Sequence, residues 1–433
     1  MRHFIPFLLL FVFAFADAQH IDARKIDAYL DNLEAYDQGV GSISVFKHGE
    51  EVYRRDFGQS ANPNLKVDAS TKYQVGSITK VFTAAMIWKL IEAKKLSLDT
   101  KLSEFYPKFP KSDKITIKQM LEHTSGLKDY ILKNDSVKWL SVKVPKQEIL
   151  AEIEKQGLKF EPGTGVKYSN SAFYLLKEIV EKKYHSTFGK IIQKHIISPN
   201  KLGDLAAADT NPTNISEPYN YRNKVWTKMV DYDYANSIGV GDISATPAQL
   251  NRFMHQLFHG KIVKKASLAK MIPGENEEWG RNLMPIPFRG RMFYGHAGDA
   301  SGWHTIALYD KQNDINVAIC INGHRLEHNE LYVGILDAIY SENQVLPFFV
   351  KTDDLEKYVG KFQSNDRALQ LEFYMQKSGD LMCLDVLAEV AFPMTPSATN
   401  KFYFKPLGIN LEFNQNLIFF EQNGIKLMLQ KVV

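Results

Sequence analysis

Residues 73–93, YQVGSITKVFTAAMIWKLIEA, form the most strongly helical segment of the chain. Apolar side chains recur at helical spacing from Phe82 onward, which predicts a helix over residues 79–93. Ser77 then lies at, or within one residue of, the first turn, and Lys80 follows on the same face. The segment therefore predicts a serine hydroxyl within reach of a lysine amine at the start of a helix.

This pair has the chemistry of an activated nucleophile. A serine hydroxyl needs a neighbouring base or cation to remove or stabilise its proton. The start of a helix adds N–H groups and partial positive charge where an oxyanion forms. The alternative is that Ser77 caps the helix and Lys80 is solvated. The motif alone does not decide, because Ser-x-x-Lys also begins at Ser125, Ser198 and Ser267.

A second candidate motif is Tyr168-Ser169-Asn170, just before a predicted helix over residues 172–181. A lysine cation near Tyr168 would favour its phenolate, which could take the proton of Ser77. Asn170 could donate hydrogen bonds to a substrate carbonyl and to Lys80. The alternative is that Tyr168 packs and Asn170 caps the helix. The Tyr-x-Asn pattern also begins at Tyr221 and Tyr234.

The third motif is Gly295-His296-Ala297-Gly298, which follows a predicted strand over residues 292–294. Its glycines would let a substrate lie against the strand and use a backbone N–H as a second oxyanion donor. An inward-facing Asp299 carboxylate would oppose the oxyanion and would favour a substrate with a cation, such as a free amino terminus. The alternative for His296 is a packing or surface residue.

The order of predicted elements indicates an α+β fold. Strand-like runs at residues 42–46 and 52–57 precede a helix-rich region over residues 99–260, and strands return at 292–321. We expect an antiparallel sheet, closed by distant parts of the chain, with flanking helices and an inserted helical lobe. This domain is predicted to span residues 19–345.

The last part of the chain changes to a period of two. Apolar and polar residues alternate over residues 369–375, and Asn423-Gly424 is a strong hairpin signal. We therefore predict a small antiparallel, β-barrel-like domain over residues 346–433. It contains no candidate nucleophile.

The first eighteen residues are typical of a signal peptide. A basic start, an apolar run from Phe4 to Phe15 and the sequence Ala16-Asp17-Ala18 predict cleavage before Gln19. The apolar run is too short to span a bilayer, and no later stretch is long enough. We therefore predict an exported protein, periplasmic or secreted from a bacterium, without a stable membrane anchor.

Composition excludes several functions. The formal net charge is +4 and long basic runs are missing, so nucleic acid is not an expected partner. Cys320 and Cys383 lie in apolar segments of different predicted domains and are expected to be buried thiols. The histidines show no HExxH and no Cys/His pairs at ligand spacing, so we predict neither metal nor cofactor. No feature indicates an oligomeric state.

Together with their flanks, the three motifs resemble the serine β-lactamase and penicillin-binding-protein superfamily. The resemblance is closest to its class C β-lactamase-like branch and covers about residues 25–340. It is carried by four segments, which are residues 75–80, 121–127, 160–170 and 294–298. The C-terminal part resembles the small β domain often appended to such hydrolases.

The resemblance implies a role for each candidate residue. Ser77 would be the nucleophile, Lys80 the assisting cation and Tyr168 the general base and then acid. Asn170 would position substrate, and His296 and Gly298 would occupy the third-motif positions. The backbone N–H groups of Ser77 and Asp299 would form the oxyanion hole.

We expect a serine hydrolase that forms an acyl-enzyme with a small-molecule or peptide substrate. D-amino-acid peptides derived from peptidoglycan are the leading substrate class, through a carboxypeptidase-like or esterase activity. His296 replaces the lysine usual in penicillin-recognising enzymes and would hold a carboxylate less firmly. The alternatives are a class C-like β-lactamase and a catalytically weak penicillin- or peptidoglycan-binding protein.

Overall fold

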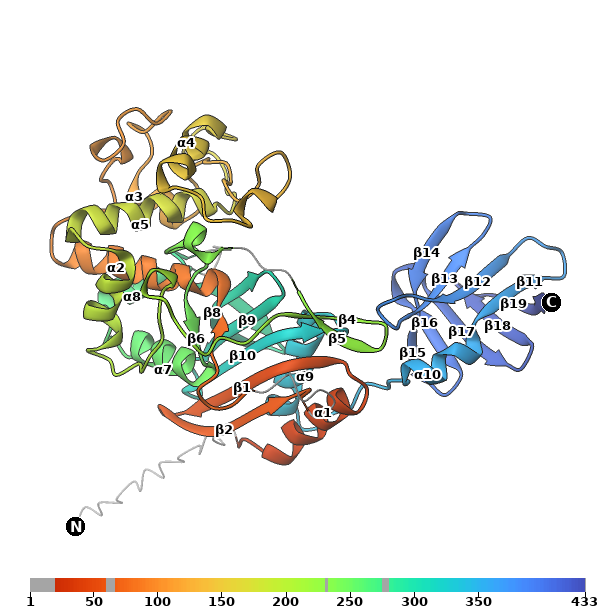
Figure 1. Ribbon diagram of the computed structural model, residues 1–433. Coiled ribbons are helices and arrows are strands. Elements are labelled where there is room, and N and C mark those ends of the chain that lie inside the picture. The colour runs from red at the N-terminus through yellow and green to blue at the C-terminus, as the bar shows by residue number, and fades with distance from the viewer. Residues whose placement is uncertain (1–19, 60–66, 230–232, 275–279, 433) are drawn as a thin grey trace, which may run out of the picture.

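The computed structural model of the chain describes residues 20–59, 67–229, 233–274 and 280–432 (Figure 1). The predicted signal peptide, residues 1–18, lies outside these ranges. Across the described ranges, no helix combines the length and the apolar character needed to cross a membrane.

The centre of the first domain is an eight-stranded sheet built from both ends of its sequence. Its main path runs in the order β2-β1-β10-β9-β8-β7, and the neighbouring strands on that path are antiparallel. β1 pairs with β10 from Gly39 opposite His324 to Lys47 opposite Ile315, so distant segments close the sheet as predicted. The strands are β1 (Gly39–Lys47), β2 (Glu50–Phe57), β4 (Tyr219–Arg222), β5 (Val225–Lys228), β7 (Met284–Phe288), β8 (Arg291–Ala300), β9 (Trp303–Asp310) and β10 (Ile315–His324).

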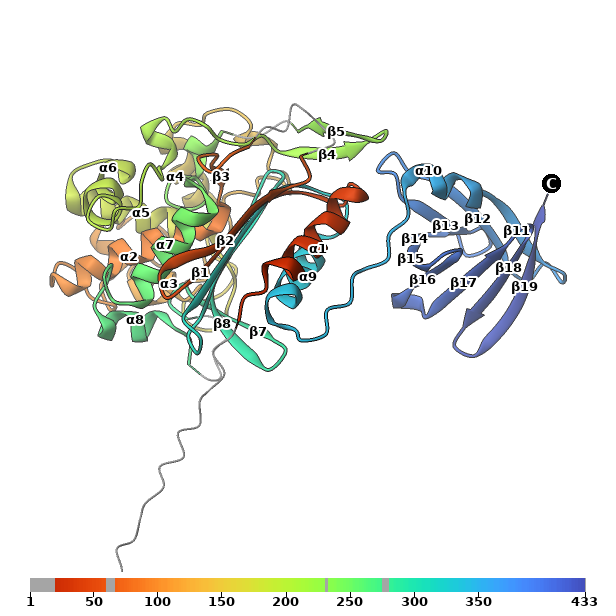
Figure 2. The same cartoon turned by 90° about the horizontal axis from the view of Figure 1, so that it is seen from below.

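Helices cover both faces of this sheet (Figure 2). α1 (Ala23–Ala35) and α9 (His328–Tyr340) pack together on one face. Their buried side chains, among them Leu30 and Ile335, form one core with Ile319 of β10. On the other face, α7 (Pro247–Phe258) contacts β1, β9 and β10.

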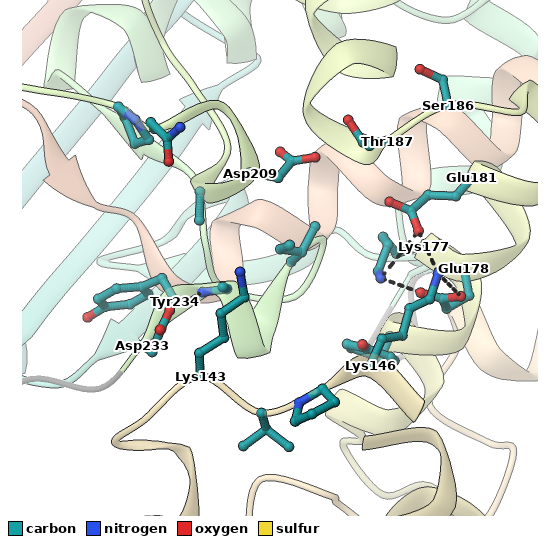
Figure 3. Close-up of a pocket in the computed structure, with 18 of the residues that line it drawn as sticks. Lys143, Lys146, Lys177, Glu178, Glu181, Ser186, Thr187, Asp209, Asp233 and Tyr234 are labelled. Carbon is teal, nitrogen blue, oxygen red and sulfur yellow. Dashed lines mark hydrogen bonds and ion pairs between the residues drawn. The ribbon is translucent and has the colours of Figure 1, made fainter. Parts of the chain in front are cut away.

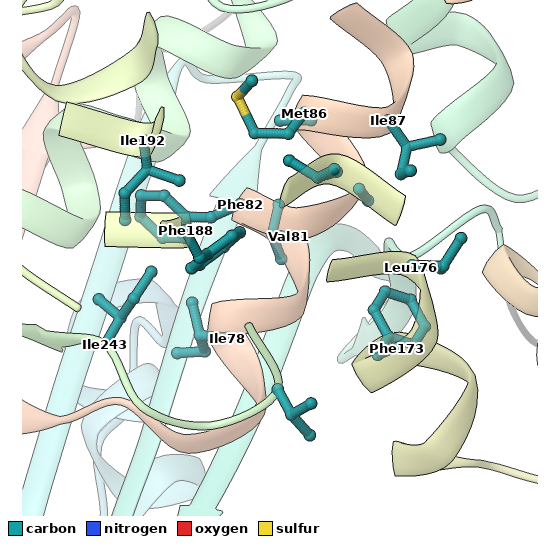
Figure 4. Close-up of a cluster of buried hydrophobic side chains, with 14 of the residues drawn as sticks. Ile78, Val81, Phe82, Met86, Ile87, Phe173, Leu176, Phe188, Ile192 and Ile243 are labelled. Atoms are coloured by element: carbon teal, nitrogen blue, oxygen red, sulfur yellow. The ribbon is translucent and has the colours of Figure 1, made fainter. Parts of the chain in front are cut away.

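The helical lobe is built around α2 (Thr79–Glu92), which is the helix predicted over residues 79–93 (Figure 4). α2 is apolar on nearly every side, because other elements enclose it. Phe82 of α2 stacks on Phe253 of α7 with ring centres 3.7 Å apart. The other lobe helices are α3 (Ile117–Leu121), α4 (Lys146–Gln156), α5 (Asn170–Tyr184), α6 (Phe188–Ile192) and α8 (Lys265–Met271).

The C-terminal part forms a separate, nine-stranded antiparallel sheet with its own core, in which Phe362, Phe373 and Phe413 contact one another. The short helix α10 (Thr352–Leu355) precedes it. The predicted C-terminal β domain is therefore confirmed in kind, and its boundary near residue 345 stays a prediction. The strands are β11 (Gly360–Ser364), β12 (Gln370–Met375), β13 (Leu381–Asp385), β14 (Val390–Pro393), β15 (Thr395–Ala398), β16 (Lys401–Phe404), β17 (Ile409–Asn414), β18 (Leu417–Gln422) and β19 (Ile425–Val432).

The two cysteines are buried and free, as expected from their apolar surroundings. Cys320 lies on β10 and Cys383 on β13, so they belong to different sheets. Burial raises the pKa of both thiols, which keeps them protonated and unreactive at neutral pH.

Candidate active site

Ser77 lies in a short 3₁₀ turn, Gly76–Ile78, which leads directly into α2. Gly76 has φ +52°, and a Cβ there would come within 2.7–2.9 Å of the Asp299 backbone. Only glycine allows this approach without strain. The turn that carries Ser77 therefore lies close against β8.

Lys80 is completely buried, and its ammonium nitrogen faces Ser77. Its Nζ lies 2.9 Å from Ser77 Oγ and 2.9 Å from the carbonyl oxygen of Val240. Burial lowers the pKa of Lys80 to about 7, although the negative charge of Asp129 acts in the opposite direction. A large fraction of Lys80 is thus a neutral amine at neutral pH, able to accept a proton.

Tyr168 approaches Ser77 from another part of the chain, and its hydroxyl donates to Ser77 Oγ at 2.7 Å. The structure thereby brings Ser77, Lys80 and Tyr168 together as the sequence predicted. The expected phenolate is not favoured, because burial raises the pKa of Tyr168. The carboxylates of Asp129 and Asp299 raise it further. Tyr168 is a phenol in this site.

Asn170 is the first residue of α5, and Ser169 caps that helix by accepting from the Ala172 N–H at 3.2 Å. The Asn170 amide donates to the Asp129 carboxylate at 2.8 Å, where a bond to Lys80 was expected. Sequence reasoning missed Asp129, which follows the quoted segment 121–127 but matches no motif. Asp129 fixes the Asn170 amide at the edge of the site.

His123, within that same segment, packs beside Tyr168 with ring centres 4.4 Å apart. Its Nδ1 accepts from the Ser169 N–H at 3.2 Å. Burial lowers the pKa of His123 well below its usual range. His123 is therefore a neutral ring that supports the loop carrying Tyr168.

The third motif lies inside β8, which continues to Ala300 and not only to Tyr294 as predicted. The strand extends because it pairs with β9 along its full length, down to Ala300 opposite Trp303. A Cβ on Gly298 would lie 2.0 Å from the Val75 carbonyl oxygen. Gly298 thus allows β8 to pass against the turn that carries Ser77.

His296 is buried, with 2% of its surface exposed, and it lines the cavity next to Ser77. Burial lowers its pKa to about 4, so the ring is neutral at physiological pH. Its Nδ1 lies 2.5 Å from the Ala297 carbonyl oxygen. Within the described residues its Nε2 has no hydrogen-bond partner. A substrate group could therefore bind there.

Asp299 lines the same cavity as Ser77, and its carboxylate is bonded to His304. Alternate residues of a strand face opposite sides, so Asp299 lies on the side of β8 away from His296 and Gly298. Its carboxylate lies 2.6 Å from His304 Nδ1, and its side chain is 70% exposed. The bond to His304 lowers the pKa of Asp299. The structure gives this carboxylate His304 as a partner, and the cationic substrate considered from sequence stays a prediction.

These side chains open onto a cavity of about 690 Å³. Its lining includes Ser77, Tyr168, Asn170 and His296, together with the apolar side chains of Ile131, Val137, Leu140 and Met284. Such a cavity offers room for an apolar side chain next to a polar reacting group.

A larger cavity of about 1200 Å³ lies elsewhere in the lobe, and none of the motif residues line it (Figure 3). Four of its charged side chains, Lys146, Lys177, Glu178 and Glu181, pair with one another. Glu178 accepts from Lys177 at 2.6 Å and from Lys146 at 3.2 Å. Among the described residues, the serine that contacts both a buried lysine and a tyrosine hydroxyl lines the smaller cavity, which is therefore the candidate active site.

The model of the family described as Beta-lactamase matches residues 25–339. The chain belongs to the beta-lactamase family. It is therefore a serine hydrolase of the β-lactamase and penicillin-binding-protein superfamily. A penicillin-binding protein of Bacillus subtilis (strain 168) is 22% identical over 428 residues, which cover 90% of this chain and 93% of that protein.

Solved structures share the fold of this family member. The octameric penicillin-binding protein homologue from Pyrococcus abyssi superposes with a TM-score of 0.71 at 21% identity. It covers 95% of this chain and 100% of its own. D-amino acid amidase from Ochrobactrum anthropi SV3 gives a TM-score of 0.65 at 22% identity, covering 73% of this chain and 97% of its own.

Proposed function

We propose that Ser77 attacks an amide or ester carbonyl and forms an acyl-enzyme that water then hydrolyses. The observation that carries this proposal is the position of Ser77 Oγ, which lies 2.9 Å from Lys80 Nζ and 2.7 Å from the Tyr168 hydroxyl. A nucleophile in contact with two proton-transfer groups is the minimum machinery for acyl transfer.

In this proposal the neutral Lys80 amine takes the proton of Ser77 as Oγ bonds to the carbonyl carbon. The N–H groups of Ser77 and Asp299 stabilise the oxyanion, since the Asp299 backbone lies against Gly76. Tyr168 gives its proton to the leaving nitrogen or oxygen, and the Lys80 ammonium restores that proton. Water repeats these steps in reverse to release the acid. Lys80, rather than Tyr168, is thus the first base.

The substrate we propose is an amide, peptide or ester of a D-amino acid, with peptidoglycan fragments as the leading source. The apolar lining formed by Ile131, Val137 and Leu140 suits an apolar side chain. A fold shared with a D-amino acid amidase supports this class. The export predicted from residues 1–18 would bring the enzyme to the cell wall, where such substrates occur.

A penicillin-binding role is a second candidate, favoured by the penicillin-binding relative that matches most of the chain. His296 opposes efficient β-lactam turnover, because a neutral ring offers no cation to a β-lactam carboxylate. We therefore expect slow, stoichiometric acylation by penicillins and little hydrolysis of nitrocefin.

Intact-mass spectrometry of the wild type and Ser77→Ala, after exposure to a β-lactam, a fluorophosphonate and an activated D-alanyl ester, tests the proposal. We expect an adduct on the wild type and none on Ser77→Ala. A Ser125→Ala variant, at another Ser-x-x-Lys motif, is the matched control and should label like the wild type. An adduct that persists in Ser77→Ala, or no wild-type adduct with any probe, would reject Ser77 as the nucleophile.

A further inference from the structure

Three histidines meet where β9 begins, β10 ends and α9 begins. They are His304, His324 and His328, and one nitrogen from each lies within 4.8 Å of the others. Residues that are 20 positions apart in sequence thereby share one site. All three are partly buried, which shields them from bulk water without closing the site.

Two of these rings are oriented by hydrogen bonds at Nδ1. His304 Nδ1 lies 2.6 Å from the Asp299 carboxylate, and His324 Nδ1 lies 3.1 Å from the carbonyl oxygen of Leu326. Both partners are acceptors, so each Nδ1 carries the proton and each Nε2 presents its lone pair. Metal-binding histidines commonly have this arrangement, in which a carboxylate or carbonyl fixes the tautomer and the ring.

The third ring, His328, is the first residue of α9. Its Nδ1 is buried and has no hydrogen-bond partner within the described residues. The ring stacks on His304 with centres 4.2 Å apart and planes 11° apart. One of its nitrogens already lies within 4.8 Å of a nitrogen of His304 and of His324, so a small side-chain adjustment would complete a shared site.

We propose that His304, His324 and His328 bind one Zn²⁺ ion, with Asp299 as the carboxylate behind His304. Three neutral imidazoles with an open fourth position for water form a well-known zinc coordination set, with Zn–N distances of about 2.0–2.1 Å. Short motif patterns did not reveal this site, because only His324 and His328 are close in sequence. The proposal replaces our expectation of no metal and does not depend on the acyl-enzyme proposal.

A second group, His255, His259 and Asp314, is less suited to a metal ion, although its ligand atoms also lie within 4.8 Å. Its carboxylate already accepts from the Tyr309 hydroxyl at 3.1 Å, and His48 Nδ1 lies 3.2 Å away. The two groups lie at opposite ends of β9 and β10, because Asp314 is in the turn between these strands. A substitution in the second group, His259→Ala, therefore serves as the control for loss of a histidine outside the proposed zinc site.

The position of the proposed zinc site gives it a consequence for the active site. A bound ion would join β9, β10 and α9 and would hold His304 in place. His304 in turn holds the side chain of Asp299, whose backbone lies against Gly76 in the turn of Ser77. Zinc would thereby stiffen the strand proposed to supply an oxyanion donor.

Equilibrium dialysis of the mature chain, prepared without a histidine tag and stripped of metal, measures the zinc content directly. We expect one Zn²⁺ per wild-type chain at micromolar free zinc, and one in His259→Ala. His328→Ala and His324→Ala should bind at least about 10-fold more weakly, and Asp299→Asn about 10- to 100-fold more weakly. Co²⁺ should give the visible absorption of a tetrahedral, nitrogen-ligated site in the wild type and in His259→Ala. The variants that lack one of the three histidines should not give it.

Thermal unfolding separates metal binding from damage to the fold. Zinc should raise the unfolding temperature of the wild type and His259→Ala by about 3 °C or more and leave His328→Ala unchanged. If His328→Ala does not fold, His328→Gln replaces it. The proposal is overturned if the wild type binds no zinc at 50-fold excess, or if His259→Ala loses zinc while His328→Ala retains it.

Discussion

Lys80 shows how a single buried side chain sets the pH range of the proposed reaction. Its folded pKa of about 7 lies below the value of about 10.4 for a lysine in water. Proton binding is thus weaker in the folded state, so burial of the ammonium opposes folding below pH 7. That penalty decreases as the pH rises from 7 to 10.4. The same burial supplies a neutral base where a solvated lysine would be protonated.

We predict that kcat/KM for an activated D-amino-acid ester decreases about tenfold per pH unit below an apparent pKa near 7. Activity decreases because protonation of Lys80 removes the base that takes the proton of Ser77. A pH–rate profile between pH 5 and 10 measures this limb. If Tyr168 were the first base, activity would instead rise in the alkaline range, because burial raises the pKa of its phenol.

Asp129 acts on two site residues, which makes its substitution informative. Asp129→Asn removes the charge that raises the pKa of Lys80 and weakens the hold on the Asn170 amide. We predict that the acidic limb moves to lower pH and that kcat/KM at its optimum decreases about 10-fold. Asp135→Asn, in the exposed part of the same loop, should leave the profile unchanged. An acidic limb that stays in place would show that Asp129 does not act on the base.

At the scale of elements, the site depends on the contact between β8 and the turn Gly76–Ile78. Gly298→Ala would place a methyl group 2.0 Å from the Val75 carbonyl oxygen, with no strain from its own backbone angles. We predict a loss of about 2–3 kcal/mol in the free energy of unfolding and a loss of activity of at least 100-fold. Urea unfolding and ester hydrolysis measure the two effects.

Gly165→Ala is the matched control for that substitution. A Cβ at Gly165 would have Phe160 as its nearest neighbour, at an ordinary 3.6 Å. We expect a change below about 0.5 kcal/mol in stability. If Gly165→Ala lost as much stability and activity as Gly298→Ala, the losses would come from adding a methyl group at any glycine. The close contact between β8 and the turn of Ser77 would then not be their cause.

Local sequence was sufficient where the contacts are local. Ser77 and Lys80 are three residues apart, so their proximity followed from their spacing at the start of a helix, and α2 begins at Thr79 as predicted. The burial that lowers the pKa of Lys80 involves the distant residues Tyr168, Phe173 and Val240, and a sequence does not show it. The Asn170–Asp129 bond and the three-histidine group were missed for the same reason, because they join distant segments.

Three of the strands missed from sequence share a physical cause. β7, β14 and β15 all contain proline, which lacks the N–H group that a central strand must donate. Each of them lies at an end of its strand order, where that donor is not needed. A rule that rejects proline in strands therefore loses edge strands and retains central ones.

At the scale of the whole molecule, the two sheets are connected by an extended segment over residues 341–351 and by contacts near it (Figure 1). The β4–β5 hairpin contributes a bond from the Asn223 N–H to the Lys377 carbonyl oxygen at 2.8 Å. Lys224, in the same turn, pairs with Glu356 at 2.8 Å. Exposed ion pairs of this kind stabilise a folded protein by about 0–1 kcal/mol each. We therefore expect a buried contact to contribute more to holding the two domains together.

Arg325 provides that buried contact between the two domains, since 4% of its side chain is exposed. Its guanidinium donates to the Gly379 carbonyl oxygen at 3.0 Å, lies 3.3 Å from the Asp380 carboxylate and covers the Tyr221 ring. One side chain thus joins the loop after β10 to the second sheet. Its loss would leave the buried Gly379 carbonyl oxygen with only the 3.5 Å bond from the Thr352 hydroxyl, at a cost of about 1–3 kcal/mol.

We predict that Arg325→Met increases the rate of proteolytic cleavage within residues 341–351 several-fold and separates the unfolding transitions of the two domains. Hydrolysis of a small ester should change less than twofold, since the active-site cavity lies in the first domain alone. Lys361→Met removes an exposed pair with Glu372 inside the second domain and serves as the control. Equal cleavage rates in the two variants would show that Arg325 does not hold the domains together. The extended segment itself would then set their separation.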